Sequence, residues 1–244
     1  MERLLNKVAI VTGAAGGMGA SHARKFVEEG AKVVLTDLNE QAGTALANEL
    51  GENAMFIKQD VTSQADWENV VSETEKAFGP VNILVNNAGI SMNNSIEQTS
   101  LDQYLKIVNI NQVSVFLGMK TVVSSMKKTE NGSIVNISSM NGLVAGAIGY
   151  TDTKFAVRGM KKAAAIDFSR YGIRVNSVHP GVIETPMITT GDAVEVIKEF
   201  AKHIPLKRVA QSEEITNLVL FLASEESSYS TGSEFVADGG LTAQ

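Results

Sequence analysis

A tyrosine and a lysine stand four residues apart in the segment YTDTK, as Tyr150 and Lys154. Residues at this spacing project from one face of a helix, so the phenol and the ammonium would be neighbours. A phenol with an ordinary pKa of about 10 is a poor base at neutral pH, and a nearby positive charge stabilises its phenolate. Tyr150 could then take a proton from an alcohol while a hydride leaves the carbon, and return it in reduction.

Ser138 ends the β-branched run GSIVNIS that precedes this pair, and Ser139 follows it directly. At the carboxyl end of a strand, a serine hydroxyl could hydrogen-bond a substrate carbonyl oxygen and stabilise its developing charge. The alternative is a turn serine that satisfies backbone groups. Serine-hydrolase chemistry is not expected, because no G-x-S-x-G elbow surrounds the two serines.

A glycine-rich turn, TGAAGGMG at 12–19, directly follows the first β-branched run. A pyrophosphate could lie at the N-terminus of the next helix, where free N–H groups and the helix dipole favour an anion. Gly13 would permit the tight turn, Gly17 a close approach of the backbone, and Gly19 close contact between helix and strand. The alternative is a glycine-rich turn that binds nothing.

Asp37 ends the second β-branched run, about where a dinucleotide fold places the carboxylate that holds the adenosine ribose hydroxyls. This charge would repel a 2′-phosphate, and no arginine stands beside it in TDLN to offset it. NAD is therefore expected in preference to NADP, and the alternative is an exposed aspartate at a strand end. Asp60 and Val61, after the third strand, could flank the adenine, although an aspartate before a helix is common.

The elements that must position these residues alternate along the chain. Short β-branched runs, nearly continuous in apolar residues as buried parallel strands are, alternate with longer amphipathic stretches. This alternation implies right-handed crossovers and an α/β fold with a doubly wound parallel sheet covered by helices on both faces. Ser100 and Gln103 form a capping box that predicts a helix over 101–128. Helices are also expected over 149–170 and 212–224, and a last strand over 233–238.

Composition limits the class of protein. The 244 residues, with 44% hydrophobic and 20% charged, predict one domain over 1–244, since no linker or repeat interrupts them. A net charge of −6 with scattered basic residues argues against nucleic-acid binding. The absence of cysteine excludes disulfides and thiolate catalysis. No apolar run is long enough for a signal peptide or a membrane span, so a soluble cytoplasmic protein without a membrane partner is expected.

The three histidines, His22, His179 and His203, fit no metal-binding spacing. His22 is expected on the surface of the first helix. His179 precedes Pro180 at a strand end and could shape the pocket, whereas a catalytic role is not expected.

Together these motifs resemble the classical short-chain dehydrogenases/reductases along the full length of the chain. The resemblance rests on the glycine turn, Asp37, the pair Asp60-Val61, NNAG at 86–89, Asn111 within VNINQVSVF, the Ser-Tyr-Lys set and HPGVIETPM at 179–187. It implies a single-domain Rossmann fold, a seven-stranded sheet in the order 3-2-1-4-5-6-7, and a nicotinamide cofactor.

The resemblance also implies a catalytic tetrad of Asn111, Ser139, Tyr150 and Lys154. In that family the asparagine kinks its helix, and its backbone carbonyl orders a water behind the lysine; a buried helix asparagine is the alternative. The implied cofactor-binding residues are Gly13, Gly17, Met18, Gly19, Asp37, Leu38, Asp60, Val61, Asn87, Ala88, Gly89, Tyr150, Lys154, Pro180, Gly181, Val182 and Thr185.

Three segments, FVEEGAKV, TEKAFGPV and the ending TGSEFVADGGLTAQ, look like the R-specific secondary-alcohol dehydrogenases. Those enzymes are homotetramers whose C-terminal residue helps to hold a structural Mg²⁺. The likeness thus implies a homotetramer and a Mg²⁺ site at Gln244. Those enzymes favour NADPH and lack an acid at the position of Asp37, so this sequence departs from them toward NAD.

The segment between Ser139 and Tyr150 is about two residues shorter than is usual in this family. Either the pocket is wider there, or the strand end shifts and Ser138 lies closer; the NISS block favours Ser139. Residues 184–205 correspond to the segment that covers substrate, and their apolar residues predict a mainly apolar substrate, although any lid helix needs an apolar face. The expected substrate-binding residues are Ser139, Leu143, Val144, Tyr150 and Met187.

We therefore expect an NAD-dependent oxidoreductase that transfers a hydride between nicotinamide and a secondary alcohol or ketone, with Tyr150 as general acid/base. Within this class the alternatives are a hydroxysteroid dehydrogenase and a 3-oxoacyl thioester reductase. A basic patch near the pocket mouth would favour the thioester, because its carrier or coenzyme A is anionic. From a different class, the alternative is a non-catalytic dinucleotide-binding regulator, which usually lacks an intact Tyr/Lys pair.

Overall fold

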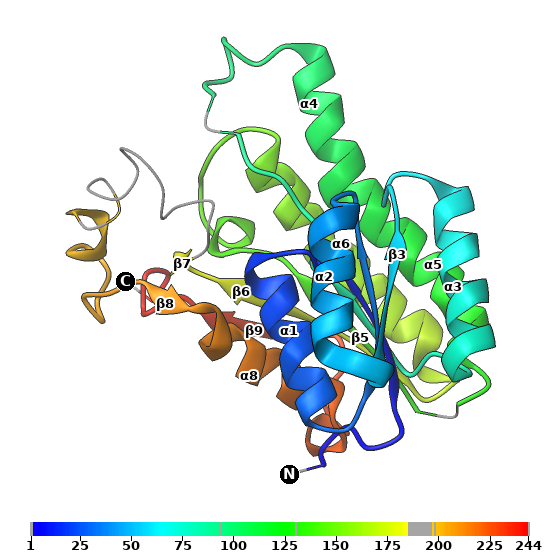
Figure 1. Ribbon diagram of the computed structural model, residues 1–244. Helices are drawn as coiled ribbons and strands as arrows, with labels where there is room; N and C mark the ends of the chain where they lie inside the picture. The colour runs from blue at the N-terminus through cyan, green and yellow to red at the C-terminus, as the bar shows by residue number, and fades with distance from the viewer. Residues whose placement is uncertain (1, 93, 130, 185–196, 198, 244) are drawn as a thin grey trace.

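Seven parallel strands form the central sheet of the computed structural model, which describes residues 2–92, 94–129, 131–184, 197 and 199–243 (Figure 1). Their order is β3-β2-β1-β4-β5-β6-β9, which confirms the predicted doubly wound order with β9 as the seventh strand. The strands are β1 (Val8–Thr12), β2 (Lys32–Asp37), β3 (Ala54–Lys58), β4 (Ile83–Asn86), β5 (Gly132–Ile137), β6 (Ile173–Pro180) and β9 (Glu234–Ala237).

Helices cover both faces of this sheet, as predicted (Figure 1). One face packs on α1, α2 and α8 around Phe26 and Val219, and the other on α3, α5 and α6 around Trp67 and Ile134. Apolar residues on both faces of β1 and β4 explain why these strands read as continuous hydrophobic runs. The helices are α1 (Gly17–Glu28), α2 (Glu40–Leu50), α3 (Gln64–Phe78), α5 (Ser114–Met126), α6 (Tyr150–Ser169) and α8 (Ser212–Ala223).

A long helix projects beyond the sheet and contains a π-helical turn (Figure 1). It begins at a capping box, in which Ser100 Oγ accepts from the Gln103 N–H at 3.2 Å and Gln103 Oε1 accepts from the Ser100 N–H at 3.0 Å. α4 (Leu101–Val108) then passes through the π-helical turn η2 (Asn109–Val113) into α5. A π turn inserts an extra residue into the helix and is frequent at functional sites. Here it interrupts the regular hydrogen bonding of the predicted helix at Asn111, whose side chain is buried.

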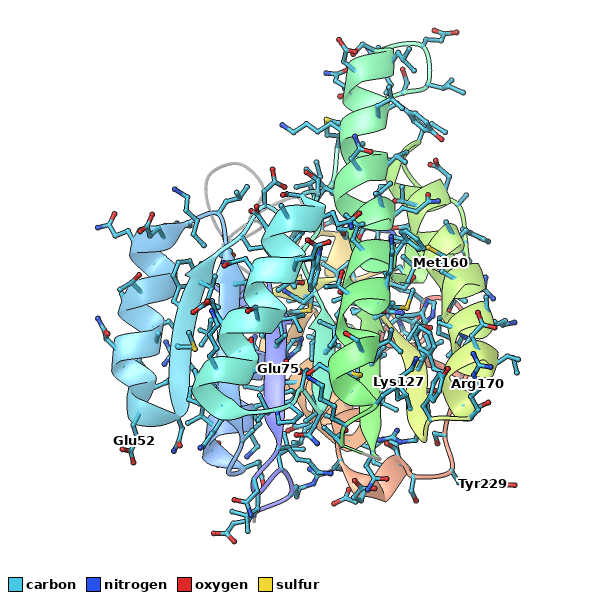
Figure 2. All side chains as sticks on the ribbon, turned by 90° about the vertical axis from the view of Figure 1, so that its right-hand side faces the viewer. Glu52, Glu75, Lys127, Met160, Arg170 and Tyr229 are labelled. Carbon is cyan, nitrogen blue, oxygen red and sulfur yellow. The ribbon has the colours of Figure 1, made fainter. Side chains whose placement is uncertain are left out.

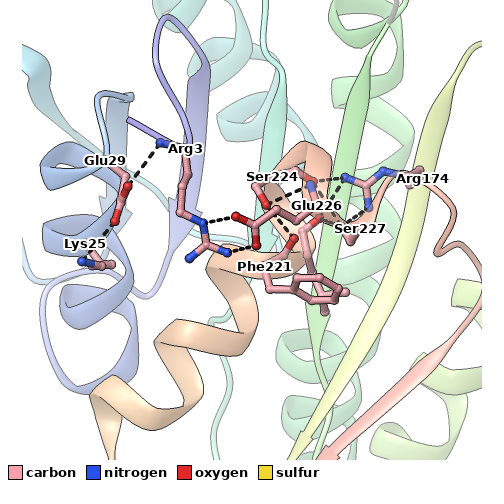
Figure 3. Close-up of polar contacts among 9 residues, drawn as sticks. Arg3, Lys25, Glu29, Arg174, Phe221, Ser224, Glu226 and Ser227 are labelled. Atoms are coloured by element: carbon pink, nitrogen blue, oxygen red, sulfur yellow. Dashed lines mark hydrogen bonds and ion pairs between the residues drawn. The ribbon is translucent and has the colours of Figure 1, made fainter. Parts of the chain in front are cut away.

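Arg174 on β6 caps the C-terminal end of α8 (Figure 3). Its guanidinium donates to the carbonyl oxygens of Leu222 and Ser224, each at 3.0 Å. The last carbonyls of a helix lack partners within the helix, so a cation there satisfies them and complements the dipole. Arg3 binds Glu226 at 2.8 Å beside this end, which ties the N-terminal segment to the 3-10 turn η4 (Glu225–Ser227) (Figure 3).

The expectation that His22 lies on the surface is wrong. Its side chain is fully buried where α1 packs on α8, and its Nδ1 lies 2.7 Å from Thr216 Oγ1. Burial lowers the pKa of His22 to about 3, so the ring is neutral at ordinary pH. His22 is buried because α1 contacts α8, which is distant in the sequence. The polarity of the residue alone does not reveal this contact.

A second, two-stranded parallel sheet joins β7 (Ile183–Glu184) to β8 (Ala210–Gln211). These strands flank most of the segment that was expected to cover substrate. Within it, residues 185–196 and 198 lie outside the described residues, and so do the predicted site residues Thr185 and Met187. Across the described ranges, no helix is long and apolar enough to cross a membrane.

Candidate active site

The carboxyl ends of β1, β4, β5 and β6 open into a cavity of about 530 Å³. The strand order reverses between β1 and β4, and doubly wound sheets bind ligands at the carboxyl edge beside such a reversal. The cavity is lined by the glycine turn with Asp37, by residues 87–91 and 137–139, by Tyr150 and Lys154, and by residues 180–183.

Tyr150 and Lys154 extend from the first two turns of α6 into this cavity. Lys154 Nζ lies 5.5 Å from the centre of the Tyr150 ring and donates to the carbonyl oxygen of Ile137 at 2.9 Å. Burial lowers the pKa of Lys154 to about 8 and raises the pKa of Tyr150, and a hydrogen bond with the Ser139 side chain acts against the rise in Tyr150. The Tyr150 phenol, the Lys154 amine and the Ser139 hydroxyl therefore all belong to one wall of the cavity.

The two adjacent serines have different partners. Ser138 Oγ donates to the backbone carbonyl of Lys154 at 3.0 Å, which ties the end of β5 to α6. Ser139 Oγ accepts from the Asn141 N–H at 3.1 Å, at the start of the 3-10 turn η3 (Met140–Gly142). The hydroxyl that contacts Tyr150 is thus that of Ser139, the serine that the NISS block favours.

Asn111 lies in the π-helical turn and is 1% exposed. Its Oδ1 accepts from the Ile90 N–H at 2.9 Å, and its Nδ2 donates to the Ile90 carbonyl at 2.8 Å. A carbon added at Gly89 would lie 3.3 Å from Asn111 Oδ1 and 3.6 Å from Lys154 Nζ. The asparagine side chain therefore fixes the segment after β4 close to the lysine.

Backbone conformation and close packing explain the glycines of the turn after β1. Gly13 and Gly17 have φ of +64° and +53°, a region in which residues with a Cβ are strained. A Cβ at Gly19 would lie 2.2 Å from the Gly13 carbonyl oxygen, so only glycine fits there. Asn87 Nδ2 donates to the carbonyls of Thr12 and Gly13, at 2.9 and 3.2 Å.

Thr12 is a structural residue of the site that the sequence reasoning did not single out. Its Oγ1 accepts from the backbone N–H groups of Asn87 and Ala88, each at 3.0 Å, and joins the ends of β1 and β4. The signal was present in the motif, where a threonine stands directly before the first glycine. Ile90, Ser91 and Ile183 were also missed as lining residues, although they adjoin predicted ones.

Asp37 ends β2 at the rim of the cavity and faces a second cavity of about 620 Å³. Its Oδ2 accepts from the Ala15 N–H at 3.1 Å, and its Oδ1 from the Asn39 N–H at 2.9 Å. These two bonds fix the carboxylate between the glycine turn and the start of α2. Leu38 beside it also lines the second cavity, with 64% of its surface exposed.

Asp60 and Val61 line the far side of the second cavity. Asp60 Oδ1 accepts from the backbone N–H and the hydroxyl of Thr62, at 2.9 and 2.7 Å, so the carboxylate shapes its own turn before α3. Asp102 and Lys106 of α4 complete the wall, and no sequence pattern pointed to them.

The remaining predicted residues divide into three groups. Met18, Pro180, Gly181 and Val182 line the first cavity with the residues above. Leu143 and Val144 follow η3 and, in the part of the chain that is described, do not line either cavity. Gln244 lies outside the described residues, within which no group of three or more acidic or histidine side chains could hold a metal ion.

The residues present fit an extended dinucleotide. The two cavities share Gly13, Asp37 and Gly89, so a ligand could pass from one to the other across the glycine turn. At this crossing α1 begins without a side-chain cap, which leaves its first turn open to an anion. The polar groups Asp37 and Asp60 line the second cavity and the Tyr150 phenol lines the first, so the two ends of such a ligand would meet different surroundings.

Comparisons with known proteins agree with this arrangement. A family model described as enoyl-(acyl carrier protein) reductase matches residues 13–242. The 3-alpha-(or 20-beta)-hydroxysteroid dehydrogenase of Mycobacterium tuberculosis is 48% identical over 244 residues, covering 99% of this chain and 91% of its own. The 2,5-dichloro-2,5-cyclohexadiene-1,4-diol dehydrogenase LinX of Sphingobium indicum is 43% identical, covering 98% and 97%. The NADP-dependent (R)-specific alcohol dehydrogenase of Lentilactobacillus kefiri is 40% identical, covering 100% and 99%.

Proposed function

Because this chain belongs to the short-chain dehydrogenase/reductase family, we propose that it transfers a hydride between NAD(H) and a secondary alcohol or its ketone. The relatives named above are dehydrogenases that act on CH–OH groups, and the family uses nicotinamide dinucleotides. The observation that carries the proposal is the meeting of the Tyr150 phenol, the Lys154 amine and the Ser139 hydroxyl at one cavity wall.

The dinucleotide, when bound, accepts or supplies the hydride at the carbinol carbon. The glycine turn at 13–19 would hold its pyrophosphate, and Asp37 would accept hydrogen bonds from the adenosine ribose hydroxyls. The Asp37 carboxylate also supports NAD over NADP, because it would repel a 2′-phosphate. The Lentilactobacillus relative is NADP-dependent by name, so the preference for NAD over NADP needs a test of its own.

Tyr150 carries the proton to and from the substrate oxygen. Burial raises its pKa, so the free protein holds a protonated phenol ready to give a proton to a carbonyl oxygen. In the oxidative direction the phenolate accepts the hydroxyl proton, and the Lys154 ammonium stabilises that anion. Ser139 donates a hydrogen bond to the same substrate oxygen, and Asn111 holds the segment after β4 beside the lysine.

We infer that the substrate is a mainly apolar secondary alcohol carried on a ring, with a hydroxysteroid as one member of that class. The Mycobacterium and Sphingobium relatives are named for a steroid and a cyclohexadiene diol. The cavity wall supplies Ile90, Val182 and Ile183 as apolar contacts. Among the described lining residues, Lys106 and the buried Lys154 are the cations, which argues against an anionic acyl carrier or coenzyme A.

We further propose that the chain forms the homotetramer that the sequence resemblance implies. α5 and α6 stand side by side on one face of the protein (Figure 2), and large apolar side chains are exposed along α4, α5 and α6. Such a face is typical of an interface between subunits. Light scattering after size exclusion tests it: a monomer at micromolar concentration would contradict the proposal. The exposed side chains are Leu101, Leu105, Phe116, Phe155 and Ile166.

The deciding experiment follows nicotinamide absorbance with purified protein, NADH or NADPH, and a panel of cyclic, steroid, aryl and acyl-thioester ketones. We expect NADH consumption with cyclic ketones, and its loss in Tyr150→Phe, which retains the ring but has no exchangeable proton. Coenzyme binding by fluorescence should survive in that variant. Coenzyme binding without turnover on any ketone would instead support a dinucleotide-binding regulator, and turnover near wild type in Tyr150→Phe would refute the assigned role.

A further inference from the structure

His179 near the end of β6 is a fully buried histidine that the proposed chemistry leaves unused. Its Nδ1 lies 3.1 Å from the backbone carbonyl oxygen of Ser139, and its Nε2 lies 2.9 Å from Ser177 Oγ. A carbonyl oxygen only accepts, so Nδ1 carries the proton and Nε2 accepts from the Ser177 hydroxyl. The ring therefore donates to the residue whose hydroxyl contacts Tyr150.

The charged groups that face His179 are paired with one another. Arg158 and Lys161 of α6 bind Glu234 of β9, at 2.8 and 3.4 Å. Burial lowers the pKa of His179; the bond to Ser139 and the charge of Glu234 raise it, and Arg158 and Lys161 lower it. A neutral imidazole has one N–H and one nitrogen lone pair. These match the Ser139 carbonyl, which accepts, and the Ser177 hydroxyl, which donates.

The turn that begins at Ser139 is also held from α6. Arg158 Nη1 donates to the Gly142 carbonyl at 2.8 Å, and the Gly142 N–H donates to the Ser139 carbonyl at 2.9 Å. The Ser139 carbonyl thus accepts two hydrogen bonds, one from within the turn and one from His179. Of these, the bond from His179 anchors the serine to a strand of the rigid sheet.

We propose that His179 is a positioning residue, which directs the Ser139 hydroxyl toward Tyr150 and the substrate oxygen through its hydrogen bond to the Ser139 carbonyl. This inference rests on the proposed dehydrogenase function and adds a residue to it. His179 is not among the described residues that line either cavity, so it acts through Ser139. Its loss should therefore lower kcat and leave coenzyme affinity unchanged.

Two substitutions separate the hydrogen bond from the bulk of the ring. His179→Leu fills the space without a donor and should lower kcat for ketone reduction by about 10- to 100-fold, the cost of a small misplacement of a reacting group. His179→Asn carries an N–H close to the position of Nδ1 and should restore kcat to within about threefold of wild type. Failure of asparagine to restore kcat would overturn the proposal.

A double-mutant cycle asks whether the effect passes through the Ser139 hydroxyl. In a Ser139→Ala background His179→Leu should change kcat little, because no hydroxyl remains to be directed. The same fold-loss in both backgrounds would overturn the proposal. The control is His22→Leu, since His22 is also fully buried but bonds to α8. An equal loss of kcat in this control would show general destabilisation, which also overturns the positioning role.

Separate experiments test the proposed function and the role of His179, so either can be refuted without the other. Turnover that disappears in Tyr150→Phe establishes the function, and the His179 variants then judge the positioning role alone. A readout independent of turnover is the imidazole ¹⁵N spectrum of the free protein, assigned by the signals that vanish in His179→Asn. The proposal requires the Nδ1-protonated tautomer of His179, and an Nε2-protonated or doubly protonated ring at neutral pH would overturn it.

Discussion

Replacing Lys154 by methionine should stabilise the protein at neutral pH while it removes turnover. Burial lowers the pKa of this lysine from 10.5 to about 8. At about 1.4 kcal/mol for each pKa unit, keeping the ammonium charged inside costs the folded state about 3 kcal/mol. Methionine has a similar length and no charge, so this cost disappears.

Part of the gain is lost because a backbone group loses its donor. Lys154 Nζ donates to the Ile137 carbonyl at 2.9 Å, and an unpaired buried carbonyl costs about 1–2 kcal/mol. The net gain is then about 1–2 kcal/mol at pH 7. For a chain of this length that gain corresponds to a rise in Tm of about 2–8 °C.

The gain should depend on pH in one direction. Below pH 8 lysine is charged in both the folded and the unfolded state, so the wild type bears the full cost of burial. Between about pH 8 and 10.5 the unfolded chain still holds the proton that the folded protein has released, so wild-type stability rises with pH. The advantage of Lys154→Met should therefore shrink across this range.

Urea unfolding followed by the fluorescence of Trp67, at fixed protein concentration, measures the difference at each pH. The matched control is Lys161→Met, another buried lysine, which pairs with Glu234 at 3.4 Å. Burial lowers the pKa of Lys161 as well, but Glu234 raises it, so Lys161→Met should stabilise the protein less than Lys154→Met does. A Lys154→Met protein less stable than wild type at pH 7, or an advantage that stays constant up to pH 10, would refute the reasoning.

Three further predictions concern the site. Asp37→Gly with arginine at the next position should shift the NADPH/NADH ratio of kcat/KM upward by about tenfold or more, and an unchanged ratio would contradict the charge argument. Ser139→Ala should lower kcat by about 100-fold or more with a smaller loss in Ser138→Ala, whose hydroxyl binds a backbone carbonyl; steady-state kinetics showing the reverse order would exchange their roles. Gly19→Ala should destabilise the protein by about 1–3 kcal/mol in urea unfolding, whereas Gly16→Ala, with no atom within 4 Å of the added carbon, should not.

The strands and the helix starts could be predicted because their signals are local, whereas the order of the strands was implied by the family resemblance. Ser100 and Gln103 form the capping box that their spacing indicates, and the runs of apolar residues become strands buried on both faces. Tyr150 and Lys154 meet because helical spacing alone brings them together. These features need no knowledge of what packs against them.

Features that depend on tertiary contacts could not be predicted. His22 is buried because α1 meets α8, and its partner Thr216 lies far along the chain. The resemblance implied a special role for Asn111, but the π turn that contains it and its paired bonds to Ile90 depend on the segment after β4. Lys106 reaches the second cavity because α4 projects past the sheet, which no pattern in its own segment indicates.

The small β7–β8 sheet bears on how new specificities could evolve in this chain. Ile183 pairs with Ala210 and Glu184 with Gln211, so the two ends of the intervening stretch are already fixed beside each other. The entropy of closing a loop grows only slowly, by about 0.6 kcal/mol for each doubling of its length. Insertions that leave residues 199–209 in place, where Ile204 is buried, should therefore change the stability of the main sheet little. Variation in this stretch could alter which substrates are accepted while the acid–base residues on β5 and α6 stay as they are.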